Sequence, residues 1–174
     1  MVSEFNEISV EGLKELLDAA AARVVALGCE HDLTVSTAES CTAGMVASSL
    51  GDIPGASAVL RGGAVTYCNE IKHEVLGVSQ QTLDAYTAVS EPTAREMAAG
   101  SKRIFGASVA VSLTGYAGPD GGTPEEPAGS VYIATCDDDA VLCERHVFSG
   151  SRNEVRAKAA LRALEMIADR LSVL

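Results

Sequence analysis

One serine of the sequence lies where a strand is expected to turn into a helix. Residues 37–44 (TAESCTAG) follow a short β-rich stretch and precede small residues typical of a tightly packed helix that ends near Leu50. A hydroxyl at such a junction points up from the sheet edge, beside the free N–H groups of the helix N-terminus, which could stabilise an oxyanion. The segment therefore predicts a serine nucleophile at Ser40, or a Ser40 or Thr42 side chain that only caps the helix. Cys41 is the competing nucleophile, although small buried cysteines are commonly inert.

A lysine follows at a second expected junction between a strand and a helix. Residues 58–67 predict the strand, and Asn69 predicts the N-cap of a short helix, which places Lys72 at the third helical position. A cation in the first turn of a helix opposes the helix dipole, so helix stability does not explain Lys72. A buried, neutral Lys72 could act as a base, with Tyr67 near the same end of the strand. The alternative is an exposed lysine beside Glu70.

Two further segments could hold an anionic substrate. The turn at residues 114–122 (TGYAGPDGG) is rich in glycine, which lets backbone N–H groups approach an anion closely. Residues 149–152 (SGSR) open the last expected helix with two hydroxyls and an arginine, a combination that suits a phosphate. Neither segment contains a Walker or dinucleotide-binding motif. A structural turn and a plain helix cap therefore remain open as alternatives.

Composition argues against several other classes of function. The 24 acidic residues outnumber the 13 basic ones, and the net charge of −11 with no basic run argues against nucleic acid or an anionic membrane as a partner. The three histidines are far apart and belong to no metal motif, so no metal is expected. The 5 cysteines lack C-x-x-C spacing, and no signal peptide or membrane span is recognisable, which predicts reduced thiols in the cytoplasm. A homo-oligomer is compatible with the apolar composition.

The elements that position these segments alternate along the chain, whose 174 residues are typical of one domain. Hydrophobic periodicity predicts a first helix over residues 9–28, with Gly28 as its stop. Strands are predicted over 33–37, 58–67, 107–113, 129–136 and 141–148. Further helices are predicted before Leu50 and over 69–76, 80–86, 91–105 and 151–171. The pattern predicts a flexible N-terminus at residues 1–8 and a single domain over residues 9–174. Its fold class is α/β, a three-layer α/β/α arrangement around a mixed sheet of about five strands.

Taken in order, these segments resemble the C-terminal domain of the CinA family. The resemblance covers about residues 10–170 and rests on five ordered motifs: Ala38–Gly44, Gly63–Lys72, Val89–Pro92, Thr114–Gly122 and Phe148–Arg152. Active members of this competence/damage-inducible protein family are nicotinamide mononucleotide deamidases. The resemblance therefore implies hydrolysis of the carboxamide of that nucleotide to nicotinate mononucleotide and ammonia, in pyridine-nucleotide salvage. The implied reaction passes through a serine acyl-enzyme and needs no cofactor.

The resemblance also implies roles for individual residues. Ser40 would be the nucleophile, and a neutral Lys72 would take its proton directly or through Tyr67. Backbone N–H groups after Ser40 would hold the oxyanion, and Arg152 would bind the phosphate of the substrate. The other implied substrate-binding residues are Thr42, Gly44, Asn69, Thr114, Gly115, Gly118, Asp120 and Gly121.

Two positions depart from the usual pattern of the family. Ala43 stands where the family has a glycine, and Tyr116 stands where an aliphatic residue is usual. The methyl group of Ala43 adds bulk beside the backbone that follows the serine, and Tyr116 could alter the rim of the pocket. The alternative to an amidase is therefore a catalytically silent nucleotide-binding or regulatory module with the same fold.

Overall fold

The computed structural model of the chain describes residues 10–174, along which helices and strands alternate. Five strands form one sheet in the order β2-β1-β3-β4-β5. They are β1 (Val35–Glu39), β2 (Leu60–Val65), β3 (Val109–Gly115), β4 (Ser130–Cys136) and β5 (Val141–Val147). β1 is parallel to β2 and β3, whereas β4 is antiparallel to β3 and β5. The mixed five-stranded sheet is thus confirmed, while the flexible segment expected at residues 1–8 lies outside the described residues.

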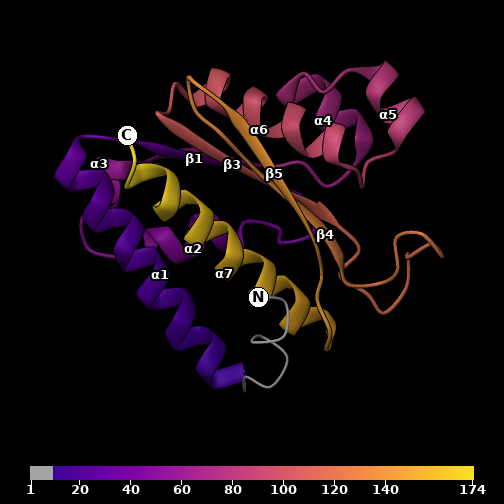
Figure 1. Cartoon of the computed structure of the whole chain (residues 1–174), viewed down its shortest axis with the longest axis horizontal. Coiled ribbons are helices and arrows are strands. Elements are labelled where there is room, and N and C mark those ends of the chain that lie inside the picture. Colours follow the sequence, from indigo (N-terminus) through magenta and orange to yellow (C-terminus); the bar gives the residue numbers. More distant parts are fainter. Residues whose placement is uncertain (1–9) are drawn as a thin grey trace.

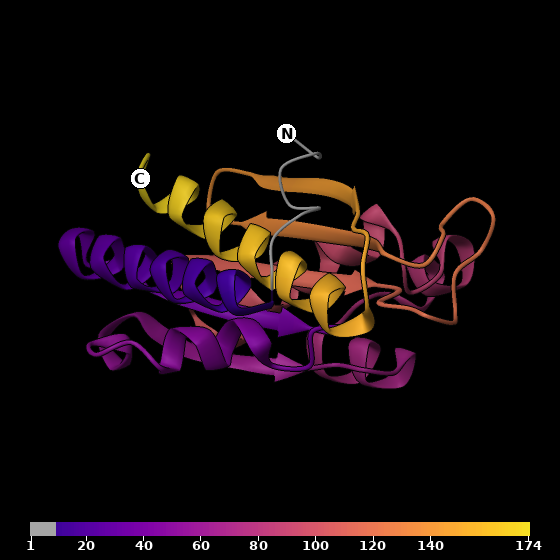
Figure 2. The ribbon, with the colours of Figure 1, turned by 90° about the horizontal axis from the view of Figure 1, so that it is seen from below.

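The helices of the described residues cover both faces of this sheet. They are α1 (Val10–His31), α2 (Met45–Gly51), α3 (Ala56–Val59), α4 (Asn69–Leu76), α5 (Gln80–Tyr86), α6 (Glu91–Phe105) and α7 (Arg152–Leu171). Helices α1, α2 and α7 lie on one face, and α4, α5 and α6 lie on the other (Figure 1). Seen after a 90° turn, α1 and α7 run side by side across the sheet (Figure 2). The three-layer α/β/α architecture expected from the sequence is therefore confirmed.

The main hydrophobic core lies between the sheet and the helix pair α1 and α7. Its side chains are largely aliphatic, as the shortage of aromatic residues requires, and Val24, Val111 and Leu164 are typical fully buried members. Burial of one such side chain contributes roughly 1.5–3 kcal/mol to folding. The central strand β3 is buried on both faces nearly to its end, which fixes the sheet edge from which Thr114 and Gly115 emerge.

Several element boundaries differ from those predicted. The prediction that the first helix stops at Gly28 is wrong, because α1 continues to His31. A Cβ atom at position 28 would lie 2.6 Å from Cγ1 of Val59, so this glycine lets α3 pack directly against α1. Helix α3 was not predicted, and it takes up the start of the expected strand, which begins only at Leu60. β1 likewise starts at Val35, two positions after the predicted start.

The C-terminal part of the chain follows the prediction closely. Strands β4 and β5 form the expected hairpin, with residues 137–140 at its tip. Ser151 is the N-cap of α7, and it forms a capping box with Glu154 that satisfies two backbone N–H groups. No helix found between residues 10 and 174 combines the length and the apolar character that crossing a bilayer would require. The same residues contain no cluster of His, Cys, Asp or Glu side chains suited to a metal ion.

Candidate active site

Ser40 lies in a turn directly after β1, not at the start of a helix. Helix α2 begins only after Gly44, which is its N-cap. The first N–H groups of the helix are already occupied, because the buried carboxylate of Glu39 accepts from the N–H groups of Gly44, Val46 and Ala47 at 2.9, 3.2 and 2.9 Å. The prediction that Ser40 or Thr42 caps the helix is therefore wrong, and these N–H groups at the α2 N-terminus are not free to hold an oxyanion.

The turn itself has an unusual backbone conformation, and Arg156 of α7 forms hydrogen bonds to it. Ala43 has a φ angle of 53°, in the left-handed region that side chains rarely adopt. The guanidinium of Arg156 donates to the carbonyl oxygens of Cys41 and Thr42 at 3.1 and 2.8 Å. Thr42 is fully buried in this turn, and its hydroxyl has no hydrogen-bond partner among residues 10–174.

The side-chain amine of Lys72 lies next to the hydroxyl group of Ser40. Its Nζ atom lies 3.1 Å from Oγ of Ser40 and donates to the carbonyl oxygen of Thr66 at 2.8 Å. Only 1% of Lys72 and 8% of Ser40 are exposed to solvent. Burial lowers the pKa of Lys72, while the neighbouring thiols of Cys41 and Cys68 act in the opposite direction. Such an environment favours the neutral amine, the form that can accept the serine proton.

The position of Lys72 in its helix differs slightly from the prediction. Cys68, not Asn69, is the N-cap of α4, so Lys72 is the fourth helical residue. It shares the buried face of the helix with Leu76, which lies one turn later. The alternative of an exposed lysine beside Glu70 is therefore wrong.

Tyr67 and Arg152 form a bridge at the mouth of the site. The Tyr67 hydroxyl accepts from Nη2 of Arg152 at 2.7 Å, and Nη1 of the same arginine donates to the carbonyl oxygen of Gly118 at 3.0 Å. Within residues 10–174, the Tyr67 hydroxyl makes no hydrogen bond to Ser40 or Lys72. Tyr67 is 57% exposed, so its ring is available to a ligand.

These side chains surround one cavity of about 230 Å³ at the carboxyl ends of β1, β2 and β3. Parallel strands commonly present ligand sites at this edge. Of the site residues inferred from the sequence, the cavity brings together Ser40, Tyr67, Lys72, Thr114, Gly115, Asp120 and Arg152. It also includes Cys41, Ala88, Val89, Tyr116 and Ala117. Of these, Cys41, Val89, Tyr116 and Ala117 lie within the ordered motifs, whereas no pattern in the sequence pointed to Ala88.

Other predicted binding residues do not line this cavity. Thr42 is buried in the turn beneath it, and the N–H group of Gly44 is used by Glu39. Asn69 and Gly121 are exposed, the first at the start of α4 and the second in the glycine-rich loop.

Gly118 lines an adjacent hollow of about 160 Å³ beside the N-terminus of α7. Ala117 and Arg152 line both this hollow and the serine cavity, so the two spaces are neighbours. The Thr114 side chain is used within the fold, because its hydroxyl donates to the carbonyl oxygen of Ala88 at 2.6 Å.

Cys41 is poorly suited to act as the nucleophile. Its thiol is 5% exposed, and burial raises its pKa to about 11. The thiolate is the reactive form, so little of it is present near neutral pH. The electrostatic environment thus favours the Ser40 hydroxyl over the neighbouring thiol.

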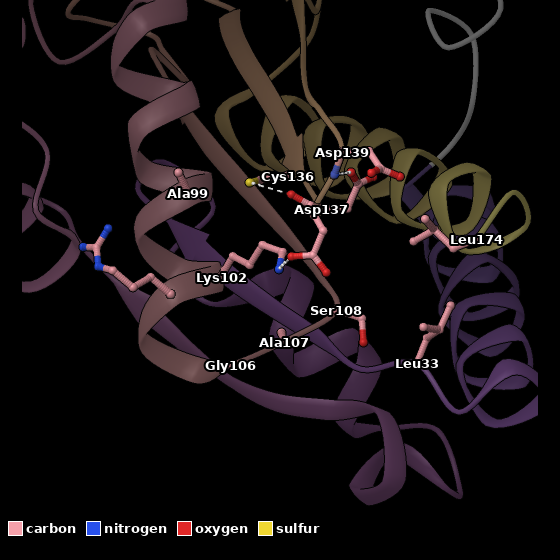
Figure 3. A pocket seen from close by; sticks show the side chains of 12 residues that line it. Leu33, Ala99, Lys102, Gly106, Ala107, Ser108, Cys136, Asp137, Asp139 and Leu174 are labelled. Atoms are coloured by element: carbon pink, nitrogen blue, oxygen red, sulfur yellow. Dashed lines mark hydrogen bonds and ion pairs between the residues drawn. The ribbon is translucent and has the colours of Figure 1, made fainter.

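A larger hollow of about 740 Å³ lies at the opposite end of the sheet (Figure 3). Ser108, which precedes β3, and Cys136, which ends the antiparallel β4, mark this end. Several of its charged groups are already paired: Lys102 Nζ lies 2.6 Å from Oδ1 of Asp138, and Asp137 forms an ion pair with Arg170 of α7. None of the inferred site residues lines it, so the serine cavity is the better candidate despite its smaller volume.

Sequence comparison relates the chain to a known family over most of its length. The model of the CinA C-terminal domain matches residues 17–171. The CinA-like protein of Anaeromyxobacter dehalogenans is 46% identical over 162 residues, which are 93% of this chain and 39% of that protein. The CinA-like protein of Thermotoga maritima is 44% identical over 142 residues, which are 82% of this chain and 35% of that protein. The chain thus spans little more than a third of the length of these curated relatives.

Solved structures of similar length have the same fold. The competence/damage inducible protein CihA from Agrobacterium tumefaciens superposes with a TM-score of 0.87 at 40% identity, covering 90% of this chain and 96% of that one. A CinA superfamily protein from Klebsiella pneumoniae gives a TM-score of 0.87 at 33% identity, covering 91% of this chain and 99% of that one. By its sequence and by its fold, the chain belongs to the CinA C-terminal domain family.

Proposed function

We propose that the chain is an amidase that hydrolyses the carboxamide of nicotinamide mononucleotide to nicotinate mononucleotide and ammonia. The observation that carries this proposal is the 3.1 Å contact between the buried amine of Lys72 and the hydroxyl of Ser40. Burial lowers the pKa of Lys72, which favours the neutral amine, the form that can act as the base for a serine nucleophile. Family membership supports the same chemistry, because the resemblance of the motifs implies it.

The reaction needs only groups that the chain provides and water. Lys72 takes the proton of Ser40 while Oγ bonds to the carboxamide carbon, and the negative charge moves to the carboxamide oxygen. Collapse of this tetrahedral intermediate breaks the C–N bond, and the protonated Lys72 returns the proton to the leaving ammonia. Lys72 then deprotonates a water molecule that attacks the ester, which releases the carboxylic acid and restores the Ser40 hydroxyl.

Arg152 is the group that we assign to the phosphate. Both of its hydrogen bonds described above go to neutral acceptors, the Tyr67 hydroxyl and the Gly118 carbonyl. Among residues 10–174 no carboxylate forms an ion pair with it, so its charge is available to an anion. Guanidinium and phosphate form strong bidentate hydrogen bonds. Asp120, on the same cavity, supplies an acceptor for the ribose hydroxyls.

The test is turnover by the purified protein. Incubation with nicotinamide mononucleotide should release ammonia and an equal amount of nicotinate mononucleotide, measured by a coupled assay and by chromatography. Ser40→Ala and Lys72→Met should each lower kcat by roughly 100- to 10,000-fold. Ser48→Ala is the matched control, because Ser48 is an exposed residue of α2 outside the cavity.

Two results would argue against the proposal. Release of ammonia by Ser40→Ala at the wild-type rate would remove the serine mechanism. Binding of the nucleotide without turnover by the wild-type protein would instead support the silent nucleotide-binding module.

Nicotinamide riboside, which lacks the phosphate, should be hydrolysed with a higher KM than the nucleotide if Arg152 binds that group.

A further inference from the structure

We propose that Arg156 is a positioning residue that holds the turn after β1 in the shape needed for attack by Ser40. This inference rests on the proposed function, because it concerns the same nucleophile. Arg156 lies on α7, far from Ser40 in the sequence, and it does not line the serine cavity. Its effect on the reaction would therefore pass through the turn and not through contact with substrate.

The guanidinium of Arg156 forms hydrogen bonds to two consecutive peptide groups. Its Nε atom donates to the carbonyl oxygen of Cys41 at 3.1 Å, and its Nη2 atom donates to that of Thr42 at 2.8 Å. The third nitrogen, Nη1, is 3.5 Å from Oδ1 of Asn153 on the same helix. A guanidinium is planar and its donors are fixed relative to one another, so it sets the orientation of both carbonyls together.

Fixing these carbonyls also fixes the N–H groups of the turn. In a trans peptide the C=O and N–H bonds point in opposite directions, so the N–H group of Thr42 is directed away from Arg156. The Ser40 carbonyl is likewise occupied, because it accepts from the N–H group of Ala43 at 3.1 Å, which directs the N–H group of Cys41 the other way. Among residues 10–174 neither of these two N–H groups donates to a protein oxygen. Cys41 lines the serine cavity, so its N–H group is the donor that we assign to the oxyanion, whereas Thr42 is fully buried.

The second half of the turn is held by a different charge. Glu39 accepts from Gly44, Val46 and Ala47, and so it fixes the N–H groups after the left-handed residue Ala43. A strained backbone conformation persists only where its surroundings hold it firmly. The hydrogen bonds of Glu39 and Arg156 hold the turn in this conformation. Without Arg156 the donors of the first half would be free to reorient.

The first test separates kcat from KM. Arg156→Ala should lower kcat roughly 10- to 100-fold, since loss of a single oxyanion donor commonly costs that much or more. KM should stay within about threefold of wild type, because a positioning residue contributes to the transition state and not to ground-state binding. The kcat of Arg156→Lys should lie between those of wild type and Arg156→Ala, since an ammonium group cannot fix two carbonyls in one plane. Millimolar guanidinium should restore part of kcat in Arg156→Ala.

Arg162 provides the matched control on the same helix. Its guanidinium pairs with Glu144 and Glu165, away from the serine turn. Arg162→Ala should lower the melting temperature but keep kcat, and guanidinium should not raise its rate. Equal losses of kcat in Arg156→Ala and Arg162→Ala, or a raised KM with normal kcat in Arg156→Ala, would overturn the positioning role.

A covalent probe keeps this inference separate from the choice of substrate. Phenylmethanesulfonyl fluoride should sulfonylate Ser40 in the wild-type protein, and intact mass should show slower labelling of Arg156→Ala but not of Arg162→Ala. Labelling of Ser40 without turnover of the nucleotide would reject the proposed substrate and still test Arg156. Equal labelling rates in wild type and Arg156→Ala would overturn the role of Arg156 alone. Wild-type protein that neither turns over the nucleotide nor labels would overturn both.

Discussion

The Nζ atom of Lys72 lies 3.1 Å from the Oγ atom of Ser40, although the two residues follow different strands. The geometry comes from the way in which β1 and β2 end together. Glu39 pairs with Val65 in the parallel register, and the N–H group of Thr66 donates to the Glu39 carbonyl at 2.8 Å. The chain then enters α4. Lys72 lies on the buried face of this helix, and its Nζ atom donates to the carbonyl oxygen of Thr66. The sheet register thus places base and nucleophile next to each other.

This pair predicts activity that increases with pH. Lys72 must be neutral to accept the serine proton, so kcat/KM should rise as the amine loses its proton. Because burial lowers the pKa of Lys72, the rise should occur below ~10.4, the ordinary pKa of a lysine. Ammonia release measured across a pH series checks this, with the Ser48→Ala variant as a control that should give the same profile. A rise centred on the ordinary value would mean that Lys72 is not the titrating base.

The lowered pKa of Lys72 also predicts a pH-dependent stability. The unfolded chain binds the Lys72 proton more tightly than the folded chain, so the free energy of unfolding should increase with pH until the unfolded lysine also loses its proton. Lys72→Met lacks this contribution. The stability difference should therefore change in favour of wild type as the pH rises from the lowered pKa of folded Lys72 to ~10.4, the ordinary pKa of a lysine, by ~1.4 kcal/mol for each pH unit that separates the folded and unfolded pKa values. Urea unfolding of both proteins at several pH values measures it, and a constant difference would contradict the assignment.

Local signals in the sequence predicted some of these features well. The cap of α7 was predictable because Ser151 and Glu154 are close in the chain and satisfy each other. The strand β3 was predictable because a short, continuous apolar run is typical of a strand that is buried on both faces of a sheet. Ser40 and Lys72 could each be recognised as unusual because each lies beside a predicted helix start. Only the resemblance to a family implied that the two residues belong to the same site.

Contacts between distant segments could not be predicted in the same way. Arg156 donates a hydrogen bond to the carbonyl oxygen of Cys41, which lies 115 positions earlier in the chain. No local pattern in the sequence distinguishes this arginine from the exposed arginines of a helix. The capping of α2 by Glu39 displaced the expected role of Ser40, because a carboxylate at a strand end reaches further than a hydroxyl. Gly28 reads locally as a helix stop, but close packing against Val59 is what requires it.

Cys41 should be a slow thiol that is dispensable for turnover. Its pKa of about 11 predicts slow alkylation by iodoacetamide near neutral pH, whereas the exposed Cys68 should react much faster and so serves as an internal control. Cys41→Ala should retain activity far above that of Ser40→Ala. Mass spectrometry of peptides after timed alkylation and the ammonia assay measure the two effects. Loss of activity in Cys41→Ala as complete as in Ser40→Ala would favour a cysteine nucleophile.

Tyr67→Phe should act mainly on substrate binding. The change removes the hydroxyl that accepts from Arg152, and the loss of one hydrogen bond of ~1 kcal/mol should raise KM for the nucleotide by about fivefold. Direct transfer of the proton between Ser40 and Lys72 should leave kcat within about threefold of wild type, since their contact does not include Tyr67. Steady-state kinetics separate the two parameters. A large fall in kcat at unchanged KM would instead place Tyr67 on the proton route.

Ala43→Gly should stabilise the protein, because it removes the side chain from a residue in the left-handed region. The φ angle of 53° at Ala43 costs an alanine about 1 kcal/mol relative to a glycine, which adopts this conformation freely. For a domain of this size, that gain corresponds to a melting temperature higher by about 2–4 °C. Ala47→Gly is the matched control within α2, where the same change in a helix should instead cost roughly 0.5–1 kcal/mol. If both variants melted below wild type, the positive φ at position 43 would not be a source of strain, and the glycine usual in the family would need another explanation.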